Sequence, residues 1–413
     1  MKLGLVMIVA SLVFTSASGQ QYGWRGPSRS GIYNEKGLMT TWPASGPQLL
    51  WEATGIGMGY SSATVTNDAV YITGKKEDKD VLTAFTQDGK KKWEVIYGSS
   101  PTDVRAPETR STATVVNNRI FVSSGQGEMT CVSKEGKVIW TVNYFQKYKG
   151  PTPQFGISES PLVADNKVIG TPGGNMTSMV AFNVENGNIL WEAPTLNEGT
   201  NYVNPLLIEY GGKKIIVTLT DGHIIGVNAA DGKLLWKFDY EGQNAERRDG
   251  RAHINTPIYR DGFLFAANGY QQIAVKIKIN EDGSEPSLVW KSPDIGPHIG
   301  GMVLIGNYIF GSTHDTNSRG RWVCIDWTTG KTMWQTLWNN KGAIIANDGL
   351  LYVIEEKNGT VGLLKPNPEK FDLISSFQIT KGEGPFWAHP VIDKGRFFVR
   401  HGNYLGVYSL KGK

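Results

Sequence analysis

A short phrase that ends in tryptophan recurs along this chain and constrains its fold more than any other feature. Copies run from Ala84 to Trp93, Cys131 to Trp140, Ala181 to Trp191, Gly226 to Trp236 and Cys324 to Trp334, with a looser copy ending at Trp290. Each copy is a short apolar segment, a turn with an Asp-Gly, Glu-Gly, Asn-Gly or Thr-Gly pair, and a second segment. Glycine accepts the positive φ that a tight turn requires, so each phrase predicts a β-hairpin.

A second predicted hairpin precedes each tryptophan-ended one. Its first strand begins at Pro161, Pro205, Pro257 and Pro390, and equivalent strands without proline begin near Thr64, Thr114, Met302 and Ile344. One unit is therefore four antiparallel strands. Successive tryptophans from Trp51 onward are 42 to 54 residues apart, close to the repeat of about 40 to 50 residues that is typical of a propeller blade.

The two ends of the chain complement each other. The last unit, Pro385–Ser409, ends before its tryptophan strand, and one orphan strand of that type, Leu49–Ala53, lies near the front. If the orphan strand completes the last unit, no sheet edge stays exposed. We therefore predict an all-β, eight-bladed β-propeller of four-stranded antiparallel blades, closed by an N-terminal strand. Seven blades is the alternative, because Phe377 is a weak copy of the repeat.

The tryptophans and cysteines of the repeat are interpreted as structural. Large aromatic side chains at one register of each outer strand are expected to dock each blade against the next; they are Trp51, Trp93, Trp140, Trp191, Trp236, Trp290 and Trp334. Cys131 and Cys324 share the register of Ala84 and Gly226, which predicts small, buried positions. An eightfold ring places them on opposite sides, so we expect no disulfide between them.

The chain is expected to divide into three parts. Residues 1–19 have the pattern of a signal peptide, with Lys2, the apolar stretch Leu3–Phe14 and small residues after it, and no cysteine for a lipid anchor. Residues 20–48 are an extended lead-in, and residues 49–413 a single propeller. We expect a monomeric periplasmic or secreted protein without a membrane span. The net charge of +4 and the absence of like-charge runs argue against nucleic acid as a partner.

The repeat Ala-x-(Asn/Asp)-x-x-x-Gly-Lys-x-x-Trp resembles that of the pyrroloquinoline-quinone-type propeller family, and Gly226–Trp236 and Cys324–Trp334 match it best. This superfamily contains quinoprotein dehydrogenases and a non-catalytic branch that includes the outer-membrane assembly lipoprotein BamB. The dehydrogenase branch implies the quinone with Ca²⁺, an ion that takes six to eight oxygen ligands. Here no two cysteines are adjacent, and the acidic residues form no ligand set: Asp103, Glu108, Glu159, Glu246 and Asp249. We therefore expect no cofactor, and in particular no quinone with Ca²⁺.

All six histidines are predicted to lie on one face of the ring. In a propeller, the loops that lead into the inner strands share a face with the connections between the second and third strands. His253, His298 and His389 precede inner strands, and His223, His314 and His401 lie at second-to-third connections. Histidine spacing does not support a metal site, although His253, His298 and His314 are the expected neighbours.

This face is predicted to form a funnel that binds a ligand at the ring centre. The candidate ligand-binding residues are Tyr60, Arg110, Glu159, Asn204, His253, His298, His314, Trp387 and His389, and around them we expect Arg105, Phe155, Tyr202, Arg247, Arg251, Tyr270, Arg319 and Lys341. Aromatic rings beside arginine and amide groups suit a sugar or a small anion. The alternative is a set of solvated loops without a ligand.

The leading functional hypothesis is an exported, non-enzymatic binding or scaffold propeller for a protein or glycan partner. Outer-membrane assembly of the BamB type is one version of it. The alternative is an enzyme that uses the histidine-rich face, resembling either a quinoprotein dehydrogenase or a carbohydrate-active enzyme.

Overall fold

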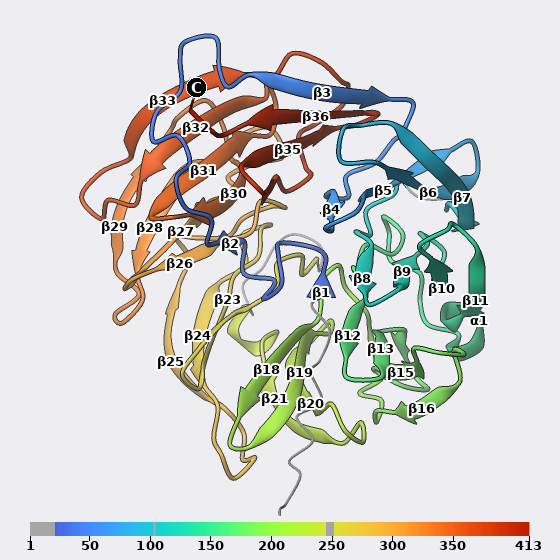
Figure 1. Ribbon diagram of the computed structural model, residues 1–413. Helices are drawn as coiled ribbons and strands as arrows, with labels where there is room; N and C mark the ends of the chain where they lie inside the picture. Colours follow the sequence, from blue (N-terminus) through green and yellow to red (C-terminus); the bar gives the residue numbers. More distant parts are fainter. Residues whose placement is uncertain (1–20, 102–104, 245–251, 413) are drawn as a thin grey trace, which may run out of the picture.

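Eight four-stranded blades surround a common axis in the computed structural model, which describes residues 21–101, 105–244 and 252–412 (Figure 1). All neighbouring strands within a blade are antiparallel. The prediction of an all-β propeller with eight blades is confirmed. The signal-peptide prediction for residues 1–19 lies outside the described residues.

The blades follow one another along the chain. The first four are β4 (Thr64–Val65), β5 (Val70–Lys76), β6 (Lys79–Phe85) and β7 (Lys91–Ser99); β8 (Thr114–Val116), β9 (Arg119–Ser123), β10 (Glu128–Ser133) and β11 (Val138–Asn143); β12 (Leu162–Ala164), β13 (Lys167–Gly170), β15 (Val180–Asn183) and β16 (Ile189–Glu192); and β18 (Leu206–Tyr210), β19 (Lys213–Leu219), β20 (His223–Asn228) and β21 (Leu234–Asp239).

The second half of the ring repeats the pattern. Its blades are β22 (Ile258–Arg260), β23 (Phe263–Ala266), β24 (Ala274–Lys278) and β25 (Ser287–Ser292); β26 (Val303–Ile305), β27 (Tyr308–Ser312), β28 (Trp322–Asp326) and β29 (Thr332–Thr336); β30 (Gly342–Asn347), β31 (Leu350–Glu355), β32 (Thr360–Lys365) and β33 (Asp372–Gln378); and β34 (Val391–Asp393), β35 (Arg396–His401), β36 (Tyr404–Ser409) and β3 (Leu49–Thr54).

The last blade is built from both ends of the chain. Strand β3 pairs antiparallel with β36, with Trp51 opposite Val407, as Figure 1 shows for the blue and dark red strands. The predicted closure by an N-terminal strand is confirmed. Phe377 lies in β33 and is buried, so the weak copy of the repeat is a complete seventh blade.

Seven of the eight blades carry a tryptophan on the outer strand that faces the next blade, and the seventh blade carries Phe377 there. The indole Nε1 of Trp93 donates to Lys134 O at 2.8 Å, that of Trp140 to Val184 O at 3.1 Å, and that of Trp334 to Asn367 O at 2.8 Å. Trp51, Trp191 and Trp290 make the same bond to the following blade. Trp236 is the exception, because its buried Nε1 has no acceptor among the described residues.

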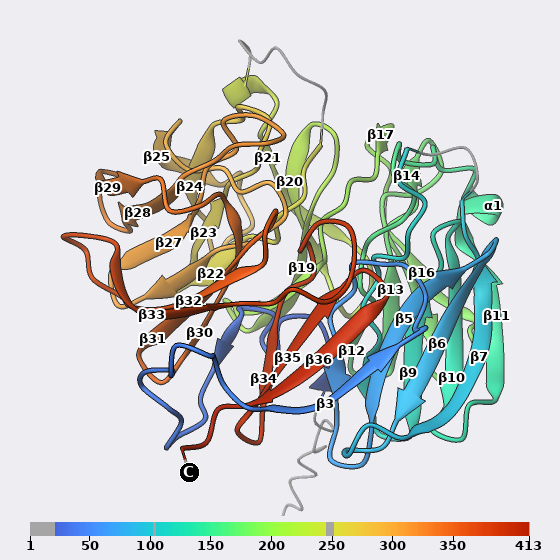
Figure 2. The same ribbon diagram turned by 90° about the horizontal axis from the view of Figure 1, so that it is seen from above.

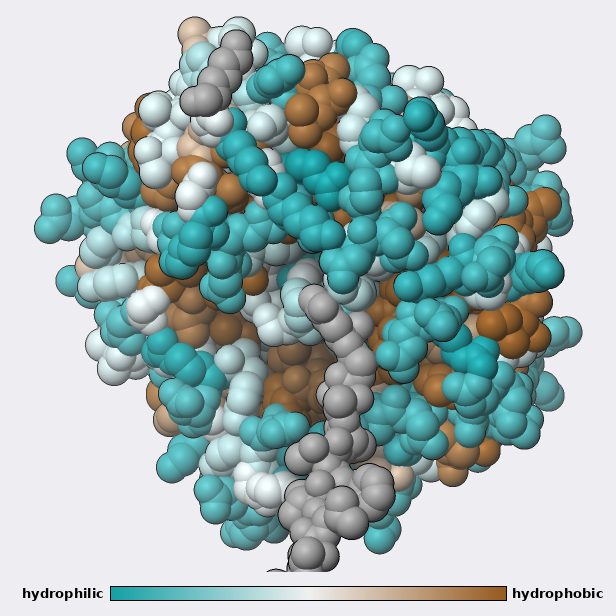
Figure 3. All heavy atoms as spheres, viewed as in Figure 1, coloured by the Kyte–Doolittle hydropathy of each residue, from teal (hydrophilic) through white to brown (hydrophobic). Residues whose placement is uncertain are grey.

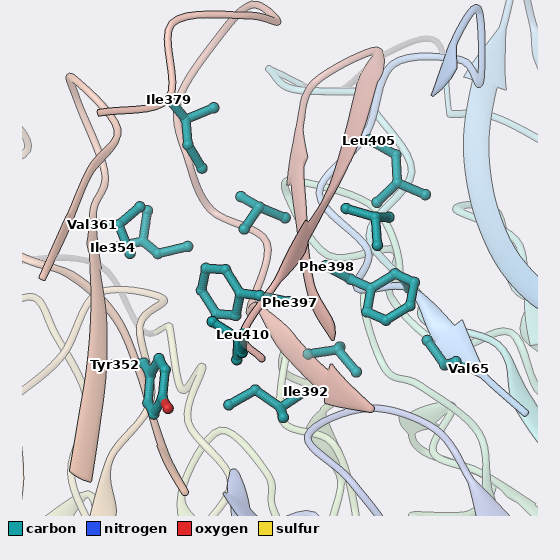
Figure 4. Close-up of a cluster of buried hydrophobic side chains, with 14 of the residues drawn as sticks. Val65, Tyr352, Ile354, Val361, Ile379, Ile392, Phe397, Phe398, Leu405 and Leu410 are labelled. Atoms are coloured by element: carbon teal, nitrogen blue, oxygen red, sulfur yellow. The ribbon is translucent and has the colours of Figure 1, made fainter. Parts of the chain in front are cut away.

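Apolar side chains fill the space between blades. Figure 4 shows this packing around the seventh and eighth blades, where Tyr352 and Ile354 of β31 lie beside Phe397 of β35. Tyr352 and Phe397 have ring centroids 5.9 Å apart, and all three side chains are almost fully buried. Each blade therefore uses both of its faces as core, as stacked sheets require.

The lead-in crosses the middle of the ring instead of only leading into it. Its strand β1 (Gln21–Tyr22) pairs antiparallel with β8, and β2 (Ile32–Tyr33) pairs parallel with β30 in the seventh blade. The segment between them, residues 23–31, is called the plug here. Figure 1 shows the lead-in in dark blue near the ring centre.

Two buried arginines anchor the plug to opposite sides of the ring. Arg25 donates to Ile344 O at 2.9 Å and to Met302 O at 2.6 Å. Arg29 donates to Ser160 O at 3.0 Å and Pro205 O at 3.2 Å, and also to Pro161 O. Burial lowers the pKa of each guanidinium to about 10, so both stay charged at neutral pH. Five carbonyl oxygens from four blades thus hold the plug by charge-assisted hydrogen bonds.

The remaining elements are small. They are α1 (Tyr144–Tyr148), the 3-10 helix η1 (Gly242–Asn244), and the two-stranded pair of β14 (Gly173–Gly174) and β17 (Glu198–Gly199). Figure 2 shows α1, β14 and β17 at the face opposite the C-terminus. No helix in the described part of the chain has the length and apolar character needed to cross a membrane.

Candidate functional site

A cavity of about 380 Å³ opens on the face that carries the loops leading into the inner strands. We call it the histidine-face cavity. Six of the nine candidate residues line it: Tyr60, Arg110, Asn204, His298, Trp387 and His389. Arg105, Phe155, Tyr202 and Tyr270 from the wider predicted set also line it, together with Trp24, Ser158, Asn317 and four apolar residues. Loops of different blades therefore converge on one concave site.

Trp24 of the plug was missed by sequence reasoning. Its ring meets the ring of His389 edge-on, with centroids 5.4 Å apart, and the Arg25 guanidinium lies 5.6 Å from the Trp24 centroid. Arg25 Nη1 also lies 2.9 Å from His389 Nδ1. Burial, and next the charge of Arg25, keep the pKa of His389 well below its usual value. His389 is therefore a neutral acceptor that fixes the plug, rather than a free acid or base.

Aromatic rings cover much of the cavity wall. Tyr60 and Trp387 have ring centroids 4.8 Å apart, and Phe155 and Tyr202 have centroids 5.8 Å apart. Burial raises the pKa of both Tyr60 and Tyr202 to about 12. These hydroxyl groups therefore remain protonated at any physiological pH and can donate hydrogen bonds.

The two arginines of the cavity differ in how they are held. Arg110 Nη1 donates to three carbonyl oxygens, those of Ala106, Glu108 and Phe155, and its guanidinium lies 5.4 Å from the Tyr60 ring centroid. Arg105 is exposed and has no hydrogen bond or ion pair with any residue in the described ranges. Arg110 is thus a wall element, and Arg105 is the cation that is free to meet a ligand.

His298 belongs to a polar chain at one side of the cavity. Its Nε2 lies 3.0 Å from the Tyr270 hydroxyl, and its Nδ1 lies 3.8 Å from Glu356 Oε2. Glu356 Oε1 in turn lies 3.0 Å from the buried Lys341 Nζ. Burial acts to raise the pKa of Glu356, but His298 and Lys341 together lower it by more than burial raises it. The pKa of Glu356 therefore lies below its usual value. The carboxylate charge is therefore compensated from two sides. Sequence reasoning did not single out Glu356.

His314 packs behind His298, with ring centroids 4.5 Å apart, and does not line the cavity. Burial, followed by the nearby His298 and Lys341, lowers the pKa of His314 to about 4. Lys341 Nζ donates to Thr316 O at 2.7 Å and to Asn317 O at 3.1 Å. Lys341 thereby holds the polar loop that carries Asn317 to the cavity.

Two other candidate residues lie outside the lining. Glu159 is buried, accepts from the Tyr144 hydroxyl at 2.7 Å and from Thr171 N at 3.1 Å, and has a pKa raised by burial. His253 is fully buried, with Nδ1 2.8 Å from Gln272 Oε1 and Nε2 3.1 Å from Asp221 O. Both side chains are committed to bonds within the fold, and neither lines the cavity.

The other two histidines are also committed elsewhere. His223 Nδ1 lies 2.7 Å from Glu198 Oε1, and the His401 ring stacks on Phe386 with centroids 3.6 Å apart. Neither lines the cavity. The predicted Arg247 and Arg251, with Asp103, Glu246 and Asp249, lie outside the described residues.

A second cavity of about 390 Å³ lies on the other side of the plug. Plug residues line it together with inner strands of the fourth, fifth and sixth blades, among them Leu206, Ile258 and Met302. Figure 3 shows the corresponding face, where hydrophobic side chains gather in the hollow near the ring centre. Trp24 lines both cavities, so the plug is their common wall.

The residues described do not fit a quinone held by Ca²⁺. No carboxylate lines the histidine-face cavity within the described ranges, and there is no group of three or more His, Cys, Asp or Glu in those ranges that could hold a metal ion. Ca²⁺ selects oxygen ligands, several of them carboxylates. Cys131 and Cys324 are buried free thiols whose pKa values burial raises to about 11 and about 12, so they are poor nucleophiles.

Comparison with known proteins gives one family and a shared fold. Residues 102–336, more than half of the chain, match the sequence model of a family described as outer membrane protein assembly factor BamB. Quinoprotein alcohol dehydrogenase PedH of Pseudomonas putida is 28% identical over 152 residues, 34% of this chain and 23% of that protein. This chain spans between 23% and 35% of the curated relatives it matches.

Two solved structures have the same architecture. BamB from Moraxella catarrhalis has a TM-score of 0.62 at 13% identity, over 88% of this chain and 99% of that one. A europium-containing methanol dehydrogenase has a TM-score of 0.60 at 12% identity, over 92% of this chain and 90% of the other. At these identities the likeness is one of fold. The family match, the repeat and the eight blades together place the chain in the quinoprotein alcohol dehydrogenase-like superfamily, as a member of the family described as outer membrane protein assembly factor BamB.

Proposed function

We propose that this protein is an exported, non-enzymatic binding propeller of the cell envelope, which holds a group of its partner in the histidine-face cavity. The single observation that carries the proposal is the chemistry of the cavity wall. Aromatic rings, hydrogen-bond donors and the free cation Arg105 converge there, which is the composition of a recognition site. A role in outer-membrane assembly is one version, supported by the family.

The residues that line the cavity give less support to two enzymatic alternatives. Glycoside hydrolysis ordinarily requires a pair of carboxylic acids flanking the scissile bond, and no acidic side chain of the described ranges lines the cavity. A quinone dehydrogenase needs a Ca²⁺ site, and the donor set described above does not fit one. The two buried thiols do not supply a nucleophile. Binding without chemistry is therefore the function best supported.

The proposal predicts that partners contact one face of the ring. A photoreactive amino acid placed at Trp387, which lines the cavity, should form discrete crosslinks in producing cells, identified by mass spectrometry. The matched control position is Lys394, an exposed turn residue between β34 and β35 at the other end of the strands. Ala252→Trp, which fills the cavity from its wall, should abolish the crosslinks while leaving the thermal melting temperature unchanged within a few degrees.

Two results would count against this function. Equal crosslinking from Trp387 and Lys394, unaffected by Ala252→Trp, would remove the cavity as the binding site. Turnover of an alcohol by purified protein supplied with pyrroloquinoline quinone and Ca²⁺ would remove the non-enzymatic part. We expect neither a change in absorbance of the quinone nor a shift in melting temperature in that titration.

A further inference from the structure

Three hydrogen-bond donors of the histidine-face cavity are not used up by the fold, and they come from two connections, one between β7 and β8 and the other between β17 and β18. Arg105 carries a guanidinium without a partner in the described part of the chain. Asn204 is buried and its Oδ1 accepts from Ser160 N, which leaves its Nδ2 group without an acceptor among the residues described. The Tyr202 hydroxyl accepts from Phe155 N at 3.3 Å and retains its own proton. A ligand that pairs with these donors must supply hydrogen-bond acceptors.

The buried carboxylates near the cavity are already paired with other groups of the protein. Glu356, the carboxylate behind His298, is compensated by Lys341 at 3.0 Å. Glu159 is buried and accepts from Tyr144 and Thr171. The described wall therefore offers a cation and amide and hydroxyl donors, without a carboxylate to balance them. This polarity selects an anionic group over a cationic one, because a buried unpaired charge is costly and a paired one is favourable.

The aromatic rings define the shape of what carries that anion. Trp24 lies at the plug, Trp387 packs on Tyr60, and Phe155 packs on Tyr202. Flat faces of this kind pack against a flat, weakly polar ring. A pyranose ring presents C–H groups on its faces and hydroxyls at its edge, whereas an aspartate or glutamate side chain has no flat face. The volume of about 380 Å³ is sufficient for one or two sugar units.

We propose that the histidine-face cavity binds an acidic sugar residue of a glycan, with the pyranose ring against the aromatic walls and the carboxylate between Arg105 and Asn204. This inference rests on the proposed binding function and names the ligand class of the same site. The hydroxyls of the sugar meet the tyrosine hydroxyls and Asn317 at the wall. The site is one of recognition, so no bond of the sugar is made or broken.

Isothermal titration of the full mature chain with tri-galacturonate tests the proposal, with the fully methyl-esterified trisaccharide as the neutral probe. We expect saturable binding of the acid and at least about tenfold weaker binding of the ester, the loss typical of a charge-assisted hydrogen bond. Binding of the acid should also weaken as NaCl rises, because Arg105 is exposed. Benzoate and a tri-glutamate peptide are tested in the same way.

Variants distinguish binding in the cavity from binding elsewhere on the same face. Arg105→Ala and Asn204→Ala should each weaken tri-galacturonate binding about tenfold, whereas Arg319→Ala should leave it unchanged. Arg319 is an exposed arginine on a loop of the same face that does not line the cavity. Asn204→Asp is a second variant that keeps the size of the side chain and places a negative charge beside the expected carboxylate, so it should weaken binding further than Asn204→Ala.

The outcomes distinguish this inference from the proposed function. Equal affinity for acid and ester, tighter binding of benzoate or of the peptide, or no effect of Arg105→Ala overturns the acidic-sugar assignment. If no acidic sugar binds at millimolar concentration but Ala252→Trp still abolishes crosslinking at Trp387, the ligand class is wrong and the cavity remains the binding site. If crosslinking is also unaffected, both proposals fail.

Discussion

Trp51 lies against Gly89 across the seam where the two ends of the chain close the ring. A Cβ atom on residue 89 would come within 2.7 Å of the Trp51 ring, and Trp51 Nε1 donates to Gln87 O at 3.1 Å in the same turn. The pair recurs as Gly136 with Trp93, and further around the ring as Gly187 with Trp140, Gly232 with Trp191 and Gly330 with Trp290. The glycine of these five repeats thus has two roles: it adopts a positive φ, and it leaves room for the tryptophan of the preceding blade.

Gly89→Ala should destabilise the protein more than the backbone conformation alone explains. Gly89 has a φ of 86°, and Gly37 has a φ of 71° with open space around its Cα. We expect Gly37→Ala to cost about 1 kcal/mol, the price of a positive φ, and Gly89→Ala about 2 to 4 kcal/mol because the indole must also shift. Urea unfolding of both variants measures the difference. Equal losses of unfolding free energy in the two variants would show that the Trp51 ring shifts easily to make room for the new Cβ atom.

Trp93→Phe and Trp236→Phe should differ by about one hydrogen bond. Trp93 Nε1 donates to Lys134 O, whereas the buried Nε1 of Trp236 has no acceptor among the described residues. Both changes remove similar ring area, but only the first removes a bond and leaves a carbonyl unpaired. We expect Trp93→Phe to lower the free energy of unfolding by about 1 kcal/mol more than Trp236→Phe does. A larger loss at Trp236 would mean that its indole is bonded in solution.

Arg25→Lys should loosen the plug. Arg25 is almost fully buried and donates to Ser30 O at 2.9 Å as well as to Ile344 O and Met302 O. A lysine cannot reach these acceptors together, so we expect a loss of about 2 to 4 kcal/mol from unpaired carbonyls. Limited trypsin digestion should then cleave after Arg29 or Lys36 faster than in the native protein. Ser28→Ala, at an exposed residue bonded only to Ser30 in the described structure, is the control.

Stability should fall between pH 6.5 and pH 4, partly through His314. Its folded-state pKa is about 4, below the usual 6.5. Between these pH values the unfolded chain binds a proton at His314 that the folded chain does not. The contribution of neutral His314 to the free energy of unfolding is therefore fully present above about pH 6.5 and is lost as the pH falls toward 4. We expect His314 to account for about 1 to 2 kcal/mol of this loss, allowing for partial solvent screening.

Urea unfolding of His314→Gln at pH 7 and pH 5 checks this expectation. The variant should lose less stability than the native protein between the two pH values. A residual loss should remain, since burial and Arg25 also depress the pKa of His389. An unchanged pH dependence would show that His314 is already accessible to protons in the folded state.

The blades could be predicted from the sequence because their signals are local. The Asp-Gly turn before Trp93 and the proline before β12 each specify one hairpin within a few residues, and repetition supplies the ring. The same reasoning placed Tyr60, Asn204 and His298 on one face, because strand order alone decides which loops share it.

The plug could not be predicted in this way. Arg25 contacts Ile344, 319 positions away, and Arg29 contacts Pro205, 176 positions away, and no periodic pattern marks such pairs. The same limit explains Glu159 and His253. The repeat predicts which connections carry these two residues, but what each side chain contacts depends on partners such as Tyr144 and Gln272.

The crossing of the ring by residues 23–31 has a consequence for exchange. A hollow ring would be open at both ends, whereas the described residues of this molecule form two separate cavities that both have Trp24 in their walls. We therefore expect a ligand of the histidine-face cavity to enter and leave past the loops of that face, and a ligand of the second cavity to do so on the other side of the plug. The two cavities differ in their walls: aromatic rings with Arg105 and Arg110 line the first, whereas aliphatic side chains with Arg25, Arg29 and Arg260 line the second.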